Sequence, residues 1–309
     1  MILPVDVFIM VRASSPIPRD GPNEWLEVLL RHKKDLSARF RSRVVRSLDV
    51  PPYLYGAFWK SIVLDEQPAK VTSKEYTALL NSEEFKFQSE IKRDINRTFP
   101  SLRFFMELNS LGQTQLYNVL KAYSIFNPEV GYCQGMGFIV GMLLSHMDEV
   151  DAFNVLVVLM DKNGEFNMQG LYKPGLPLLN EYLRELDKMI QVELPKLADH
   201  FLALGIETSM FASQWILTLL VYNLDWSEAK KMFNLFLILK IDVVLKFTLY
   251  ILHRAQTQLL TMGFEEILGR VNDMGSVKVS EFLEWLHSRE KDDSNVEKDS
   301  GSSDSIDSD

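Results

Sequence analysis

Residues 91–100 read IKRDINRTFP, and this stretch organises the middle of the chain. Apolar residues recur every four positions from Phe87 to Ile95, a spacing that predicts a helix. Pro100 disfavours the helical conformation of the residue before it. We therefore expect the helix to end at Arg97 or at the next residue, which places Arg97 at a helix C-terminus.

Arg97 has an ordinary explanation when it is considered alone. A positive charge at a helix C-terminus is favourable with the helix dipole. Asp94 lies on the same helix face and can pair with the guanidinium. The residues by themselves therefore leave the function of Arg97 open.

A second stretch, residues 131–137, reads GYCQGMG. It opens the run 136–147, which is apolar on nearly every side, a pattern typical of a buried helix. Gln134 lies in the turn between Gly131 and Gly135, and glycine lets a backbone come close to a partner. A Gln at this place either finds hydrogen bonds inside the protein or faces a ligand, and both alternatives stay open.

The remaining pattern predicts an all-α fold. The chain has only 15 Gly and 12 Pro in 309 residues, and long stretches have helical periodicity. Asn81 and Glu84 have the spacing of a capping box, which predicts a helix start there. Further helices are expected at 55–63, 116–126, 152–160, 178–192, 194–204, 211–222, 232–255 and 280–287.

Composition excludes several classes of protein. The net charge of −9 argues against broad nucleic-acid binding, which needs Lys and Arg to neutralise phosphates. Cys133 is the single cysteine, so no intrachain disulfide can form, and a reducing, cytosolic setting is expected. The start of the chain lacks a secretory signal. The run 232–252 holds central charges that would each cost about 2.5–3.5 kcal/mol in a membrane, so we expect a buried helix pair and no transmembrane segment.

Motifs for nucleotide, metal and nucleophile chemistry fail on spacing or context. Gly135, Gly137 and Gly141 miss the dinucleotide-binding pattern by one residue, and no Walker A loop is present. Residues 161–164 begin like a calcium loop, but the Gly comes too early. His and Cys show no zinc spacing, and Cys133 is better explained as a small residue in a tight turn than as a nucleophile. We expect no cofactor and no metal of the chain's own.

Three motifs occur in order along the chain. The first consists of Tyr55, Gly56 and Trp59, the second of Ile91, Asp94 and Arg97, and the third of Tyr132 and Gln134. Together they resemble the TBC domain, a family that accelerates GTP hydrolysis on Rab-type GTPases, and the similarity runs from about Val50 to Arg270.

The resemblance implies an all-α domain in two packed helical lobes. It also implies that Arg97 is an arginine finger and Gln134 a glutamine finger, both supplied in trans to a Rab-type small GTPase in its GTP form. GTP and Mg would belong to that partner, and the chain would turn over no substrate of its own. The expected setting is cytoplasmic vesicle trafficking, with peripheral association with endomembranes through the partner. The supporting residues are expected to be Asp94, Tyr132, Gly131 and Gly135.

The chain departs from the family pattern at a few positions. Tyr55 stands where the first motif has Arg, and Gly137 stands where Asn is common. Asn234 and Lys240 stand where many members have Asp and Gly. Tyr55 favours an alternative, a catalytically silent TBC scaffold that binds a small GTPase or a trafficking complex. The basic run 33–46 suggests a further alternative, a membrane-surface adaptor.

The expected domain organisation has four parts. Residues 1–48 form an N-terminal extension with short helices, and residues 49–270 form the TBC domain. Residues 271–288 form a C-terminal helix that packs on the domain. Residues 289–309 are an acidic, Ser-rich tail expected to be disordered.

Overall fold

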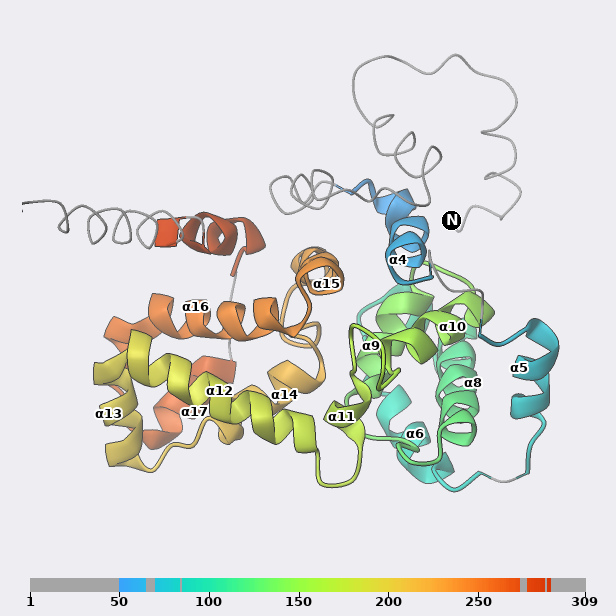
Figure 1. The fold of residues 1–309 in the computed structure, drawn as a ribbon, viewed down its shortest axis with the longest axis horizontal. Coiled ribbons are helices and arrows are strands. Elements are labelled where there is room, and N and C mark those ends of the chain that lie inside the picture. Colours follow the sequence, from blue (N-terminus) through green and yellow to red (C-terminus); the bar gives the residue numbers. More distant parts are fainter. Residues whose placement is uncertain (1–49, 65–69, 84, 273–276, 287, 290–309) are drawn as a thin grey trace, which may run out of the picture.

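The computed structural model describes residues 50–64, 70–83, 85–272, 277–286 and 288–289. Within these ranges the regular secondary structure is helical, which confirms the all-α prediction. The expected N-terminal extension and the acidic tail beyond Arg289 lie outside the described residues. The helices form two packed lobes, with α4 to α11 in the N-terminal lobe and α12 to α17 in the C-terminal lobe (Figure 1).

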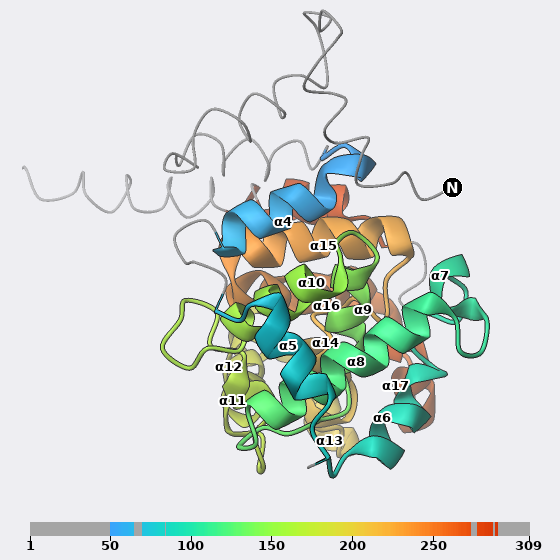
Figure 2. The same ribbon diagram turned by 90° about the vertical axis from the view of Figure 1, so that its right-hand side faces the viewer.

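The N-terminal lobe is built around α8 and α9, which pack against each other. Every residue of α9 is buried, as its apolar sequence predicts. Figure 2 shows α5 and α6 beside α8, and each packs against it. The elements of this lobe are η1 (Pro52–Leu54), α4 (Tyr55–Leu64), α5 (Ser73–Leu80), α6 (Gln88–Ile95), α7 (Arg103–Met106), α8 (Leu111–Phe126), α9 (Met136–Leu144), α10 (Glu149–Leu159) and α11 (Gln169–Tyr172).

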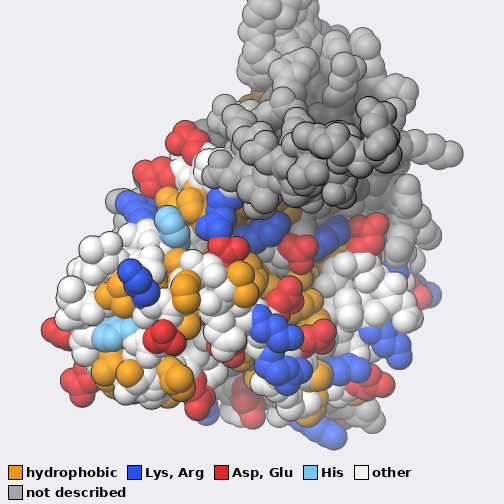
Figure 3. Space-filling model, turned by 60° about the vertical axis from the view of Figure 1, so that its left-hand side comes forward, with side chains coloured by type: hydrophobic (Ala, Val, Ile, Leu, Met, Phe, Trp, Pro, Cys, Tyr) orange, Lys and Arg blue, Asp and Glu red, His pale blue; other side chains and the backbone are white. Residues whose placement is uncertain are grey.

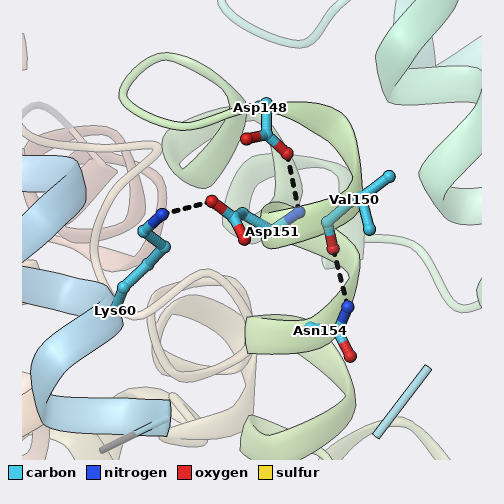
Figure 4. A network of polar contacts seen from close by, with 5 residues as sticks. All are labelled: Lys60, Asp148, Val150, Asp151 and Asn154. Atoms are coloured by element: carbon cyan, nitrogen blue, oxygen red, sulfur yellow. Dashed lines mark hydrogen bonds and ion pairs between the residues drawn. The ribbon is translucent and has the colours of Figure 1, made fainter. Parts of the chain in front are cut away.

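Polar contacts from α10 hold the outer helices of this lobe in place (Figure 4). Asp148 caps α10 by accepting a hydrogen bond from the Asp151 amide at 2.9 Å, and Asp151 pairs with Lys60 of α4. The Asn154 side chain makes two 3.0 Å hydrogen bonds to the backbone of Val71, one as acceptor and one as donor. One helix therefore fixes both α4 and the segment that leads into α5.

The C-terminal lobe joins the N-terminal lobe through α15, which packs on α4. At this contact Trp59 Nε1 donates a hydrogen bond of 2.7 Å to Asn234 Oδ1, and both side chains are fully buried. Residues 279–286 are also helical, and Phe282 packs against Phe247 at a centroid distance of 4.9 Å. The elements of this lobe are α12 (Pro177–Glu193), α13 (Pro195–Leu204), α14 (Ser209–Leu217), α15 (Trp226–Leu239), α16 (Ile241–Leu259) and α17 (Phe264–Asn272).

The predicted helix start at Asn81 is wrong. Asn81 is instead the C-cap of α5, and α6 begins only at Gln88. The capping box lies at the other end of α5. There the Thr72 side chain accepts a hydrogen bond from the Glu75 amide at 3.3 Å, and Glu75 accepts one from the Thr72 amide at 2.8 Å.

Two helices end earlier than the sequence predicts. α6 ends at Ile95 because the next residues form a tight turn, in which the Arg97 amide donates to the Asp94 carbonyl at 3.1 Å. α14 ends at Leu217, where the expected helix 211–222 gives way to a turn with Leu219 at φ 51° and Leu220 at φ 64°.

The surface and the helices give two further observations. Acidic and basic side chains are interspersed over the face shown in Figure 3, with small apolar areas between them. Among the described residues, no helix has the length and apolar character needed to cross a bilayer.

Candidate functional site

Arg97 lies in the turn that follows α6, and its side chain is 47% exposed. One guanidinium nitrogen, Nη2, lies 2.7 Å from Asp94 Oδ1, as the spacing of the two residues predicts. The Asp94 side chain is only 12% exposed, so the acceptor is fixed in the protein while the cation reaches solvent. The guanidinium keeps further N–H groups for a partner, because one carboxylate oxygen engages only part of its donor set.

The same carboxylate joins Arg97 to the turn that carries Gln134. The Tyr132 hydroxyl donates a hydrogen bond of 2.5 Å to Asp94 Oδ2. Burial first, and then this hydrogen bond, raise the pKa of Tyr132 well above its usual value, so the phenol remains a donor at neutral pH. Asp94 thus bridges the two motif segments through its two oxygens.

Gly131 allows the turn to lie directly on the start of α6. Its φ is 61°, and a Cβ at this position would lie 2.3 Å from Cζ of Phe87. Both the left-handed backbone and the close approach require glycine. The aromatic ring before α6 therefore supports the backbone that precedes Gln134.

Gly135 ends the turn and begins α9 with a φ of 109°. A Cβ there would lie 3.4 Å from the backbone oxygen of Leu217 in α14. The C-terminal lobe therefore contacts the turn immediately after Gln134.

The segment after Arg97 packs into a face of small residues on α9. A Cβ at Gly137 would lie 3.1 Å from Thr98 Oγ1, and a Cβ at Gly141 would lie 3.0 Å from ring carbons of Phe99. Phe99 adopts a φ of 48° and packs edge-on against Phe138 at 5.5 Å. This packing places the end of α6 against the helix that Gln134 precedes, and only the two glycines indicate it at the level of sequence.

Gln134 is exposed, and its side-chain amide has no hydrogen-bond partner among the described residues. The sequence left open whether this Gln is satisfied internally or faces a ligand, and the structure places it toward solvent. Its carbonyl and amide groups are therefore free to accept from and donate to a bound molecule.

The predicted site residues thus fall into one connected group. Arg97 and Gln134 carry the exposed polar groups, and the supporting residues lie buried beneath them. Cys133 is half-buried beside Gln134, and burial raises the pKa of its thiol, which disfavours the reactive thiolate. No cluster of His, Cys, Asp and Glu able to hold a metal ion occurs within the described ranges.

Comparisons with known proteins point to one family. The model of the Rab-GTPase-TBC domain matches residues 49–260. The chain is 34% identical over 246 residues to the human ecotropic viral integration site 5 protein homolog, covering 80% of this chain and 29% of that protein. It is 40% identical over 182 residues to the Rab GTPase-activating protein eat-17 of Caenorhabditis elegans, covering 59% of this chain and 20% of that protein.

The described chain therefore spans less than a third of the length of these curated relatives. Two solved structures have the same fold. The Chlamydomonas flagellar RabGAP TBC domain gives a TM-score of 0.72 at 23% identity, covering 85% of this chain and 88% of that one. The Ypt/Rab-GAP domain of Gyp1p gives a TM-score of 0.70 at 17% identity, covering 85% of this chain and 95% of that one.

Proposed function

The chain belongs to the Rab-GTPase-TBC domain family, and from this premise we propose that it accelerates GTP hydrolysis on a Rab-type GTPase. Arg97 and Gln134 would enter the nucleotide site of the partner in its GTP form, while GTP and Mg belong to the partner. The observation that carries the proposal is the Asp94 carboxylate, which holds Arg97 at 2.7 Å and Tyr132 at 2.5 Å and so ties both finger segments together.

Arg97 would stabilise the charge that grows on the phosphate oxygens in the transition state. An arginine finger is worth roughly 10³–10⁵ in rate. Asp94 would hold the guanidinium in place before the partner arrives, which reduces the entropy lost on forming the complex.

Gln134 would orient the attacking water through its side-chain carbonyl and donate a hydrogen bond through its amide. Its exposed position suits this function, because the groups that act on the partner's nucleotide must reach beyond this chain. Gly131, Gly135 and Tyr132 would fix the turn that presents it.

The partner also sets the cellular function that we propose. A Rab activator would end the GTP-bound state of its target and so regulate vesicle trafficking. It would work in the cytoplasm and reach endomembranes through the membrane-bound GTPase.

The test is phosphate release from a panel of purified, GTP-loaded Rab proteins. Arg97→Ala should lose roughly 10³-fold or more in kcat, and Gln134→Ala should also lose most of the acceleration. Arg93→Ala is the matched control, because Arg93 is an exposed Arg of α6 at a variable position of the motif, and it should keep wild-type activity. If Arg97→Ala and Gln134→Ala both keep the acceleration of the wild type, these two residues are not catalytic.

The second candidate function is a catalytically silent scaffold, which Tyr55 favours. Tyr55 packs against Trp59 at 5.5 Å and against His146 at 5.1 Å. His146 follows the C-terminal end of α9, while Gln134 precedes its N-terminal end, so the two are separated by roughly 15 Å of helix. The departure at Tyr55 therefore leaves the fingers in place. A GTPase that binds wild-type protein without faster hydrolysis would favour the scaffold.

A further inference from the structure

We propose that α11 is the positioning element for Gln134, and that it fixes the turn 127–135 from both ends. The proposal rests on the proposed GTPase-activating function, in which the orientation of Gln134 matters for rate. Three side chains of α11 and its C-cap carry it: Gln169, Tyr172 and Lys173.

Gln169 and Lys173 hold the upstream end of the turn. The Asn127 side-chain amide donates to Gln169 Oε1 at 3.2 Å, and Gln169 Nε2 donates to Glu129 Oε2 at 3.3 Å. Lys173 Nζ pairs with the same Glu129 oxygen at 2.9 Å. Gln169 is only 5% exposed, so its amide depends on these partners. The Lys173 pair is solvated and contributes little by comparison.

Tyr172 holds the downstream end through α14. Its hydroxyl donates a hydrogen bond of 2.6 Å to the backbone oxygen of Leu217, the last residue of α14. Carbonyls at a helix C-terminus lack intrahelical partners, and this bond satisfies the carbonyl of the last residue of α14. The Leu217 oxygen is also the backbone atom nearest to a Cβ placed at Gly135. Tyr172 therefore sets the surface on which Gly135 rests.

The turn needs this external support. It contains two glycines with positive φ, Gly131 and Gly135, and glycine restricts the backbone least. The Gln134 side chain has no hydrogen bond of its own among the described residues. Its direction therefore depends on how the turn is held. Tyr132 anchors the middle of the turn to Asp94, and Tyr172, 2% exposed, connects the downstream end to the core.

Tyr172→Phe tests the proposal because it removes one hydroxyl and keeps the ring. We expect kcat for GTP hydrolysis to fall about tenfold, with KM changed less than about twofold, because a small misplacement of a catalytic group is costly. In the Gln134→Ala background Tyr172→Phe should lower kcat less than about twofold, because the side chain that Tyr172 positions is gone.

The matched control is Tyr76→Phe. Tyr76 is also buried, and its hydroxyl donates to Glu149 at 2.8 Å in the contact between α5 and α10. Tyr76→Phe should lower the free energy of unfolding about as much as Tyr172→Phe does, and it should keep wild-type kcat. Gln169→Met is the second variant, since it keeps the side-chain size and removes the amide that holds Asn127 and Glu129.

Hydrogen exchange gives a readout that needs no GTPase. In Tyr172→Phe and in Gln169→Met, amides of residues 131–136 should exchange about tenfold faster or more, while those of α8 keep wild-type rates. Unchanged exchange together with unchanged kcat overturns the proposal, and so does an equal kcat loss in the Gln134→Ala background. If no Rab responds to wild type, the proposed function fails, and the exchange result alone decides whether α11 holds the turn.

Discussion

The Tyr132 hydroxyl donates a hydrogen bond of 2.5 Å to the Asp94 carboxylate, and this bond joins the segments of Arg97 and Gln134 through two residues that lie 38 positions apart in the sequence. Asp94 is 8% exposed, so the loss of this donor leaves a buried carboxylate oxygen without a protein partner. The bond therefore contributes to stability and to the position of Arg97 at the same time.

Tyr132→Phe should lower the free energy of unfolding by about 1–3 kcal/mol, the cost of an unsatisfied buried group. It should also lower the kcat of GTP hydrolysis, and this loss should be smaller in the Arg97→Ala background, because one of the two side chains that Tyr132 supports is gone. Chemical denaturation and phosphate release measure the two effects. Tyr117→Phe is the control, because Tyr117 is half-buried against Phe85 at 5.9 Å and should show neither effect.

Gly131→Ala should destabilise the protein far more than Gly175→Ala. Both glycines have positive φ, at 61° and 81°, so both substitutions carry a backbone cost of about 1–2 kcal/mol. A Cβ at Gly131 would also overlap the Phe87 ring at 2.3 Å, whereas a Cβ at Gly175 meets nothing within 4 Å. We expect Gly131→Ala to cost at least about 3 kcal/mol in total by denaturant unfolding. Equal costs would mean that Phe87 moves aside freely.

Helices were predicted well from the sequence where apolar residues recur with helical spacing or fill a whole segment. The run that became α9 is apolar on every side, and each of its residues is buried. The boundaries failed where distant contacts decide them. Leu219 and Leu220 adopt left-handed conformations that Leu disfavours, and both are fully buried, so tertiary packing overrides the local preference there.

The site was predictable to the extent that its contacts are local. The Asp94–Arg97 pair follows from helical spacing, whereas the bond from Tyr132 joins residues far apart in sequence. The residues alone left the function of Gln134 open, and the family resemblance led to the function that we propose for it. The supports from Gln169 and Tyr172 depend on the packing of α11 between the two lobes, which no local pattern encodes.

His146 should make stability depend on pH. Burial first, and then the charge of Lys230, lower the pKa of His146 from 6.5 to about 3, and its buried Nε2 has no partner among the described residues. The unfolded state binds this proton more readily, so the stabilisation is complete above about pH 6.5 and falls as pH drops toward 3. We expect the free energy of unfolding to fall by about 1–2 kcal/mol between pH 7 and pH 5. His146→Phe should flatten this part of the profile in urea unfolding, and an unchanged slope would assign it to other groups.

The Lys240→Gly variant should be more stable than the Lys240→Ala variant. It separates α15 from α16 with φ 64° and ψ −154°, a conformation that essentially only glycine adopts without strain. Its ammonium lies 2.8 Å from Glu165 and 3.6 Å from the centre of the Phe166 ring, and both variants lose these contacts equally. The difference between the variants therefore isolates the backbone. Glycine also costs more backbone entropy on folding than alanine. With this cost included, we expect the free energy of unfolding of Lys240→Gly to exceed that of Lys240→Ala by about 1–2 kcal/mol in thermal or urea unfolding. Equal stabilities would show that the α15–α16 junction relaxes when the Lys side chain is removed.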